Sequence, residues 1–197
     1  MEKETKEQNL SEESKDNHAK LGIKNIIMQI LFYGFLFFIC LYVIPNYVVQ
    51  RNFVSGPSME NTLQDKDQLI IDKLSYQFTD PKRFDIIVFY PYGKEVNEEY
   101  YIKRVIGLPG ETIQIIGSDI YINGEILEES YGKDPITNAG IAKEEITLGS
   151  DEFFVLGDNR GVSKDSRSEM VGLVKKDVIA GKLLLRIWPF SEFGTVK

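Results

Sequence analysis

The feature that most constrains this chain is an apolar run from Ile26 to Ile44, in which Gln29 is the only strongly polar side chain. At about 1.5 Å per residue, a helix of this length crosses a hydrocarbon core about 30 Å thick. A cleavable signal peptide is a competing interpretation, but a long hydrophilic segment precedes the run and no small-x-small site follows it. A buried core helix is a further alternative, although few globular helices are apolar on every face. We predict a membrane-spanning helix over residues 25–45, ended by Pro45.

The segments that flank this run differ in composition and charge. The first twenty residues are highly charged and typical of a solvated tail. Lys20 and Lys24 precede the run and Arg51 follows it, which favours a cytoplasmic N-terminus. We expect a cytoplasmic tail over residues 1–24 and an extracytoplasmic domain over residues 46–197, in a single-pass protein of the cell membrane.

Residues 46–197 carry the pattern of a mainly β domain. Short segments rich in Ile, Val, Tyr and Phe are separated by Gly, Pro, Asp and Asn. Asn123-Gly124 between two apolar segments predicts a type I′ hairpin. We expect an antiparallel sandwich or barrel-like core. The expected strands are Gln68–Leu74, Asp85–Tyr90, Tyr100–Leu108, Thr112–Ile116, Ile120–Ile122, Phe153–Leu156, Gly172–Val174 and Ile179–Trp188.

Residues 111–151 interrupt this pattern. They hold the hairpin and then a polar stretch, Glu128–Lys143, which indicates a small β cap inserted into the main sheet. The alternative is a long loop. The predicted fold class is therefore mainly β, with one N-terminal transmembrane helix, an antiparallel β core and a small β cap insertion.

Charge, cysteine and histidine counts restrict the function. A formal net charge of −7 argues against a nucleic-acid partner, because the basic surface of such proteins is missing. The single cysteine, Cys40, lies in the apolar run and reads as a small hydrophobe, so neither an intrachain disulfide nor a thiolate zinc site can form. The single histidine, His18, lies in the polar N-terminal segment, which argues against a Ser-His-Asp triad and a multi-histidine metal site. We expect no metal site.

Ser58 is a candidate nucleophile. The stretch 54–63, Val-Ser-Gly-Pro-Ser-Met-Glu-Asn-Thr-Leu, combines a Gly-Pro bend, a small hydroxyl and flanking apolar residues. Such a bend can hold a hydroxyl at a fixed angle beside a groove. The alternative is a serine that only hydrogen-bonds the backbone of its turn. Without a usable histidine, a nucleophilic serine needs another base, and lysine is the usual one.

Lys103 is the candidate base. A lysine that is neutral near pH 7 must be buried among apolar neighbours without a carboxylate partner. Lys103 lies in the aromatic and aliphatic stretch 100–111, and strand parity sets it apart from Ile102 and Arg104. The alternative is an exposed lysine on the polar face of a half-buried strand.

The polar stretch 157–167, Gly-Asp-Asn-Arg-Gly-Val-Ser-Lys-Asp-Ser-Arg, follows an apolar strand. Two aspartates and two arginines this close together predict an ion-paired loop. The loop is either purely structural or a scaffold that holds a dyad in place. Ser163 is a candidate hydrogen-bond partner for a neutral lysine amine.

In this order and behind one apolar segment, these stretches resemble the bacterial type I signal peptidases, the membrane-bound serine–lysine leader peptidases, over about residues 24–190. The short insertion and the single apolar segment resemble the smaller Gram-positive members. The resemblance implies an all-β catalytic core with a small β cap, lying against the outer membrane leaflet, and no cofactor. It also implies cleavage of signal peptides from secretory preproteins that have small residues before the cut, at the lipid bilayer and near the secretion machinery.

The resemblance also assigns roles to residues. Ser58 corresponds to the nucleophile, Lys103 to the general base and Ser163 to the serine that orients the lysine. The supporting loop residues are Asp158, Arg160, Asp165 and Arg167. The positions that line the shallow apolar substrate pockets are Val54, Met59, Leu63, Tyr101 and Ile102.

Three residues depart from the family pattern. Asn61 stands where proline is usual, and Phe84 replaces a glycine; both favour a specialised paralogue with narrower substrates. Gly56 stands where some members have a serine that donates its hydroxyl to the oxyanion, so the oxyanion would rely on the Ser58 N–H.

Two other functions remain as alternatives. A catalytically silent paralogue could use the peptide groove to assist assembly of a pilus or surface protein, since fold does not fix function. Such a protein is expected to lose the serine or the lysine, whereas this chain has both. A self-cleaving regulator of the repressor type needs a DNA-binding helix-turn-helix where this chain has its apolar run.

Overall fold

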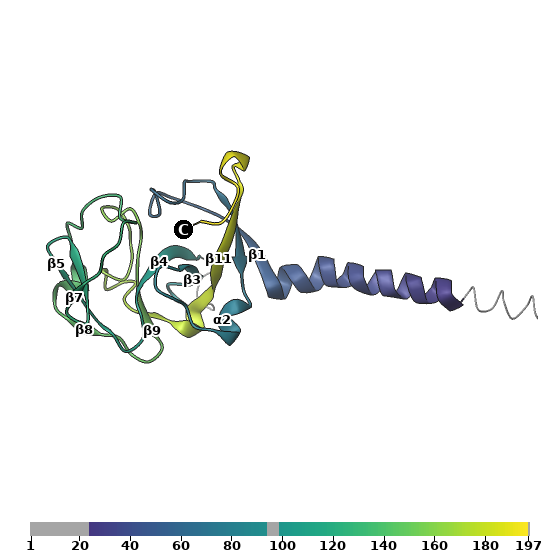
Figure 1. Cartoon of the computed structure of the whole chain (residues 1–197), viewed down its shortest axis with the longest axis horizontal. Coiled ribbons are helices and arrows are strands. Elements are labelled where there is room, and N and C mark those ends of the chain that lie inside the picture. The colour runs from purple at the N-terminus through teal and green to yellow at the C-terminus, as the bar shows by residue number, and fades with distance from the viewer. Residues whose placement is uncertain (1–23, 94–98, 197) are drawn as a thin grey trace, which may run out of the picture. The chain divides into compact units, whose positions relative to one another are not determined.

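The computed structural model describes residues 24–93 and 99–196, and the chain divides into two units, Met1–Asn46 and Tyr47–Lys197 (Figure 1). The described part of the first unit is a helix that begins at Lys24, and by length and composition its stretch Lys24–Pro45 can cross a membrane. Its large apolar side chains are exposed along most of this length. His18 and most of the predicted tail lie outside the described residues.

Pro45 does not end the helix, and that prediction was wrong. Helical structure continues through η1 (Ile39–Val48), a π-helical segment that contains Pro45. Proline lacks an N–H, and in an α-helix its ring clashes with the carbonyl four residues earlier. Local π-helical turns accommodate proline in apolar helices, because they change which carbonyls need a partner.

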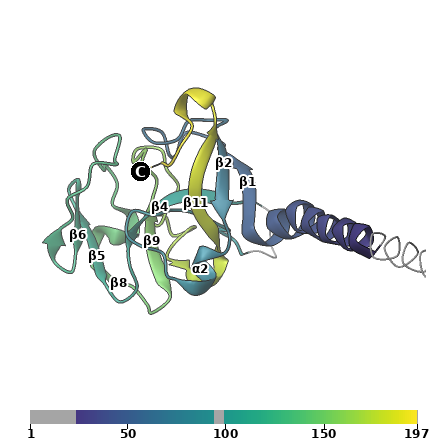
Figure 2. The same cartoon turned by 45° about the vertical axis from the view of Figure 1, so that its right-hand side comes forward.

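The second unit is built on a seven-stranded antiparallel sheet in the order β1-β2-β11-β3-β4-β9-β10. The last strand of the chain lies between β2 and β3, and register shifts against both neighbours bend it. In Figure 2 this strand runs beside β2 and β1. The strands are β1 (Val49–Phe53), β2 (Gln68–Asp72), β3 (Ile86–Phe89), β4 (Tyr101–Gly107), β9 (Glu152–Leu156), β10 (Val174–Lys175) and β11 (Ile179–Trp188).

The core lies on both faces of this sheet, because side chains alternate along each strand. Ile86 and Val88 of β3 belong to one buried cluster, and Ile87 and Phe89 belong to another. The first cluster also contains Val54, Met59 and Leu63 from the connection between β1 and β2. The stretch that carries Ser58 is therefore anchored in the core rather than free on the surface.

A second sheet of four strands has the order β7-β6-β5-β8. In both views its strands gather at the end of this unit away from β1 and β2 (Figures 1 and 2). Asn123 and Gly124 have positive φ values of 53° and 81°, as a type I′ turn requires, so the predicted hairpin is confirmed. The strands are β5 (Thr112–Ile116), β6 (Asp119–Ile122), β7 (Glu125–Ile126) and β8 (Ile146–Thr147).

The predicted fold class is confirmed, and all eight expected strands are present with ends within two residues of those expected. The sequence did not indicate β1 or β8. β1 reads Val-Gln-Arg-Asn-Phe and has no alternation of apolar and polar residues, but it pairs with β2 along its full length. The remaining elements are short: α2 (Ser75–Phe78), η2 (Gly140–Lys143), η3 (Lys176–Val178) and η4 (Phe190–Glu192).

Candidate active site

The bend before Ser58 is held by a local hydrogen bond. Gly56 has a φ of 86°, a conformation that suits glycine, and its N–H donates to Asp65 Oδ1 at 3.0 Å. Val54 and Met59 on the two sides of the bend are buried in the core. The sequence therefore fixes the position of the Ser58 side chain through a glycine turn between two apolar anchors.

Lys103 meets Ser58 from strand β4. Its Nζ donates to Ser58 Oγ at 2.8 Å and to the Ile102 carbonyl at 2.9 Å, and the residue is only 3% exposed. Burial lowers the pKa of Lys103 to about 8, although Asp165 and Asp158 act in the opposite direction. Lys103 forms no ion pair with any residue that the structure describes. With this pKa, about a tenth of the amine is neutral at pH 7, far more than for an ordinary lysine.

Ser58 and Lys103 open onto a cleft of about 420 Å³. One wall consists of residues 53–59 and the other of residues 99–103, with Val162 and Lys164 completing the lining. Four of the five predicted substrate-contact residues, Val54, Met59, Tyr101 and Ile102, line this cleft. The fifth, Leu63, does not line it and is fully buried in the core behind the bend.

Ser163 lies near the Ser58 backbone and does not form the expected hydrogen bond with Lys103. Its Oγ is buried and has no partner within the described part of the chain. Gly157 separates it from the Ser58 backbone, because a Cβ on Gly157 would lie 2.1 Å from Ser163 Oγ and 2.4 Å from Ser58 O. Next to it, the Asn159 N–H donates to Ser58 O at 3.1 Å. Gly157 was not singled out from the sequence, although it belongs to the glycine-led stretch 157–167.

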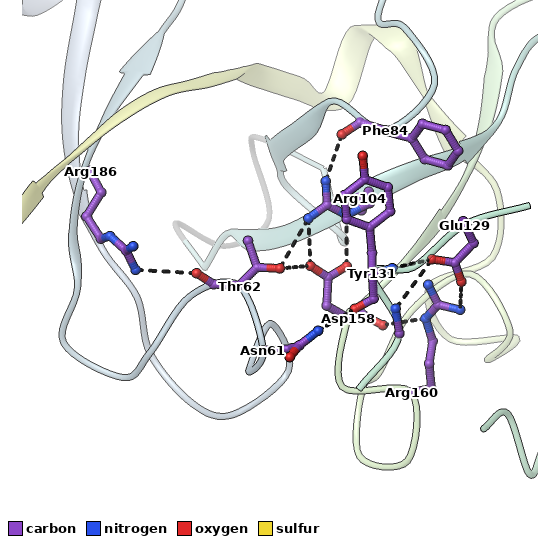
Figure 3. Close-up of polar contacts among 11 residues, drawn as sticks. Asn61, Thr62, Phe84, Arg104, Glu129, Tyr131, Asp158, Arg160 and Arg186 are labelled. Carbon is purple, nitrogen blue, oxygen red and sulfur yellow. Dashed lines mark hydrogen bonds and ion pairs between the residues drawn. The ribbon is translucent and has the colours of Figure 1, made fainter. Parts of the chain in front are cut away.

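The loop 157–167 forms one ion pair of its own and two with distant parts of the chain. Arg167 binds Asp165 through Nε–Oδ1 at 2.8 Å and Nη2–Oδ2 at 2.9 Å. Asp158 instead binds Arg104 of β4, through Nε–Oδ1 at 2.9 Å and Nη2–Oδ2 at 2.7 Å. Arg160 pairs with Glu129 at 2.7 Å. Figure 3 shows the last two pairs side by side.

The buried pair of Arg104 and Asp158 was missed by the sequence analysis, which treated Arg104 only as a neighbour of Lys103. The two side chains are 1% and 0% exposed. Arg104 also donates to the Phe84 carbonyl at 3.0 Å and to Thr62 Oγ1 at 3.3 Å, and Thr62 Oγ1 donates to Asp158 (Figure 3). This network joins β4, which carries Lys103, to the loop that carries Ser58.

Comparison with known proteins identifies the chain. It belongs to the signal peptidase family, peptidase S26, whose model matches residues 24–188. It is 42% identical over 156 residues to signal peptidase I of Leptolyngbya laminosa, which covers 77% of this chain and 74% of that protein. It is 41% identical over 165 residues to signal peptidase I of Bacillus caldolyticus, covering 78% and 85%. A crystal structure of a signal peptidase I from Enterococcus faecalis matches with a TM-score of 0.44 and 37% identity, over 53% of this chain and 97% of that one.

As a member of the peptidase S26 family, this chain is a serine endopeptidase, and such a site needs N–H donors for the oxyanion of the scissile carbonyl. The Ser58 N–H has no hydrogen-bond partner among the described residues, so it is available to a substrate oxygen. The Gly56 N–H is not available, because Asp65 accepts from it. Within residues 24–93 and 99–196, no group of three or more His, Cys, Asp or Glu side chains is arranged to hold a metal ion.

Two of the three departures from the signal peptidase pattern meet at one residue. Asn61 and Phe84 both have positive φ values, 101° and 70°. The Asn61 amide donates to the Tyr131 carbonyl at 3.1 Å, and the Phe84 ring lies 5.0 Å from the Tyr131 ring, centroid to centroid. Tyr131 comes from the polar stretch after the hairpin, to which the sequence analysis assigned no role in the site.

Proposed function

We propose that this chain removes N-terminal signal peptides from secreted preproteins by means of a dyad of Ser58 and Lys103. The observation that carries the proposal is the distance of 2.8 Å between Lys103 Nζ and Ser58 Oγ in a buried setting. Family membership supports the reaction type, since relatives are named signal peptidase I. Burial of Lys103 supports its role as base, because a lysine with its pKa lowered to about 8 can accept a proton near neutral pH.

In the first half of the reaction, the Lys103 lone pair takes the proton of Ser58 Oγ as this oxygen attacks the scissile carbonyl carbon. The carbonyl oxygen becomes an oxyanion, to which the Ser58 N–H donates. The carbon–nitrogen bond then breaks, and the Lys103 ammonium returns its proton to the leaving amine of the mature protein. The signal peptide remains as an ester on Ser58.

In the second half, Lys103 takes a proton from water as the water oxygen attacks the ester carbon. The ester bond breaks, Lys103 returns the proton to Ser58 Oγ, and the signal peptide leaves as a carboxylic acid that ionises. Each step needs the lone pair of Nζ to face the reacting oxygen. A neutral amine then has two N–H groups to direct elsewhere.

The proposed mechanism requires an acceptor for each of these N–H groups. The Ile102 carbonyl accepts one at 2.9 Å. The buried Ser163 Oγ has no partner among the described residues, and buried hydroxyls are usually hydrogen-bonded. We therefore propose that Ser163 accepts the second and orients the amine. Asp165 and Arg167 would hold the loop of Ser163, while Asp158 and Arg160 would tie it to β4 and to Glu129.

The cleft supports a preference for small residues before the scissile bond. Its lining next to the dyad is apolar, with Val54, Met59 and Ile102 on opposite walls. Apolar walls that close around a short side chain exclude a long one by steric overlap. Leu63 does not line the cleft, and its role would be to support the conformation of the Ser58 bend from the core.

The apolar helix supports a membrane anchor. In the proposed topology, residues 1–24 are cytoplasmic, residues 25–45 cross the lipid bilayer and residues 46–197 are extracytoplasmic, with residues 111–151 as a cap. An anchor of this kind raises the effective concentration of a substrate held in the same membrane near the secretion machinery. Protease treatment of intact spheroplasts tests the topology: a C-terminal tag must be lost and an N-terminal tag must be protected.

The decisive experiment is cleavage of a panel of secretory preproteins by the detergent-solubilised chain, with N-terminal sequencing of the products. Ser58→Ala and Lys103→Ala should abolish cleavage while the circular dichroism spectrum is unchanged. Lys103→Arg should also be inactive, because a guanidinium does not give up its proton. Full activity in Ser58→Ala would refute the dyad, and a parent chain that binds Ala-x-Ala peptides without cutting them would favour an assembly factor.

A further inference from the structure

Residues 129–133 leave the region of the four-stranded sheet and return to the loop that carries Ser58. The Lys133 N–H donates to the Asp158 carbonyl at 2.8 Å, and Lys133 Nζ pairs with Glu60 at 2.9 Å. The Asn61 amide donates to the Tyr131 carbonyl at 3.1 Å. Glu60 and Asn61 are the second and third residues after Ser58. The 129–133 segment thus contacts the nucleophile loop immediately beyond its bend.

The Tyr131 side chain makes the contact on the other side of the dyad. The Arg104 guanidinium carbon lies 3.7 Å from the centre of the Tyr131 ring, and Figure 3 shows the ring in front of the guanidinium. Phe84 packs against the same ring at 5.0 Å. Arg104 directly follows Lys103 on β4, and its N–H groups already bind Asp158 and the Phe84 carbonyl. The ring therefore covers the face of a guanidinium whose three nitrogens all donate hydrogen bonds along its edge.

The 129–133 segment is itself held in one conformation. Glu129 Oε2 accepts from the N–H groups of Tyr131 at 2.7 Å and Gly132 at 3.3 Å, while Oε1 pairs with Arg160 at 2.7 Å. Gly132 lies against the same arginine, since a Cβ there would be 3.2 Å from Arg160 Cζ. Tyr131 therefore lies in a turn whose conformation is held by Glu129 and Arg160 without any substrate.

We propose that Tyr131 is a positioning residue that holds the Ser58 loop against β4 and so sets the alignment of Ser58 with Lys103. Its carbonyl holds Asn61 on the serine side, and its ring holds Arg104 on the lysine side. The inference rests on the proposed function, because it concerns how that dyad is aligned. It also gives Asn61 and Phe84 a common role, since each contacts Tyr131 where the family pattern has other residues.

The test compares Tyr131→Ala, Tyr131→Phe and Tyr121→Ala in the full chain, solubilised in detergent, with one preprotein substrate. Tyr131→Ala should lower kcat about 10- to 100-fold, because a displacement of about 1 Å in a catalytic group has about that effect. KM should change little, since Tyr131 does not line the cleft. Tyr131→Phe should restore kcat, because the ring makes both aromatic contacts. Tyr121→Ala, on β6 opposite Gln114 and Ile126, should keep the parental kcat.

The pH profile separates positioning from simple loss of stability. If the Ser58 loop moves away, water reaches Lys103 and its pKa rises toward 10.5, its ordinary value. The acid limb of kcat/KM in Tyr131→Ala should then have its midpoint at a higher pH than in the parent. In Tyr131→Phe this midpoint should be the same as in the parent. The assays are run well below the unfolding temperature of each variant. A lower unfolding temperature alone then does not shift the acid limb of the kcat/KM profile.

Asn61→Gly is a second variant with little risk to folding. Asn61 is exposed, and glycine adopts its φ of 101° without strain, so only the amide contact is lost. We expect kcat to fall about 3- to 10-fold, the range of one hydrogen bond. Combined with Tyr131→Ala, its effect on kcat should be smaller than in the parent, because the amide contact and the ring contacts hold the same loop through the same residue.

An unchanged kcat and pH profile in Tyr131→Ala, with Ser58→Ala inactive, would overturn the positioning role and leave the proposed function intact. A rise in KM at constant kcat would also overturn it, since it would assign Tyr131 to substrate binding. Activity in Ser58→Ala would instead refute the dyad, and the inference with it.

Discussion

Lys103 Nζ lies 2.8 Å from Ser58 Oγ, although the two residues are 45 positions apart and Ser58 lies in a loop whose flanking strands do not pair with β4. Ser58 follows β1, whereas Lys103 lies on β4, with β2, β11 and β3 between these strands. The contact exists because the Ser58 loop packs its apolar residues on Ile86, Val88 and Ile102. Core packing, rather than strand pairing, therefore sets the distance within the proposed dyad.

The pH dependence of cleavage should follow the ionisation of Lys103. Because burial lowers the pKa of Lys103 to about 8, kcat/KM should rise with pH along an acid limb centred near pH 8. The measurement is kcat/KM for one preprotein across the range in which the chain stays folded. A limb with a midpoint at or below about pH 6 would show that another group is the base.

The buried Lys103 amine should also lower the free energy of unfolding. Its folded-state pKa is lowered, so between about pH 8 and 10.5 the unfolded chain binds more protons, and stability rises with pH through this window. Lys103→Met removes the buried amine. The variant should be more stable than the parent at pH 7 by about 3 kcal/mol, and this gain should shrink above pH 8.

Urea unfolding at pH 7 and at about pH 10 measures this effect. The exposed Lys175→Met is the control for the loss of one positive charge and should change the free energy of unfolding by less than about 0.5 kcal/mol. A Lys103→Met variant that is less stable than the parent at pH 7 would contradict the prediction.

Gly157→Ala should inactivate the chain, because its Cβ would fall 2.1 Å from Ser163 Oγ and 2.4 Å from Ser58 O. Either the serine loop or the Ser163 loop must move, and we expect a loss of about 100-fold or more in kcat. Gly161→Ala is the matched control from the same loop, since nothing lies within 4 Å of a Cβ there. Equal rates for the two variants would disprove this steric account.

Asp158→Asn should destabilise the chain strongly, because it leaves Arg104 charged, buried and without a carboxylate. Breaking a buried ion pair in this way costs about 3–5 kcal/mol. Asp80→Asn removes the partner of Lys176 in a pair whose side chains are 76% and 38% exposed, and should cost at most about 1 kcal/mol. Thermal and urea unfolding of both variants give the comparison; equal losses would mean that the buried pair is not a structural requirement.

The sequence predicted the strands well because their signals are local. Apolar segments between turn residues located β3, β4 and β9, and the Asn123-Gly124 pair located the β6–β7 hairpin. The end of the first helix was misjudged, since proline usually ends an α-helix and the π-helical turns that accommodate Pro45 have no signature in composition.

The candidate site was predicted in part. Ser58 and Lys103 were candidates from their local sequence, the resemblance to type I signal peptidases assigned their roles, and the structure brings the two side chains together. The partners of Asp158 and Arg160 were expected within their own loop, but they are Arg104 and Glu129, because sequence proximity does not determine which charges meet after folding. Tyr131 could not be predicted for the same reason: its stretch is polar and turn-rich, and its ring and carbonyl contact residues far away in the chain.

The four-stranded sheet begins after β4 and ends before β9, and these two strands are paired, with Gly107 opposite Phe154. A segment whose two ends emerge side by side can change in length without altering the strands that flank it. A label or affinity tag placed at the exposed turn of Asn123 and Gly124 should therefore leave catalysis intact. The same insertion within residues 129–133 should impair catalysis. The segment between β4 and β9 thus contains one site that tolerates an insertion and one that does not.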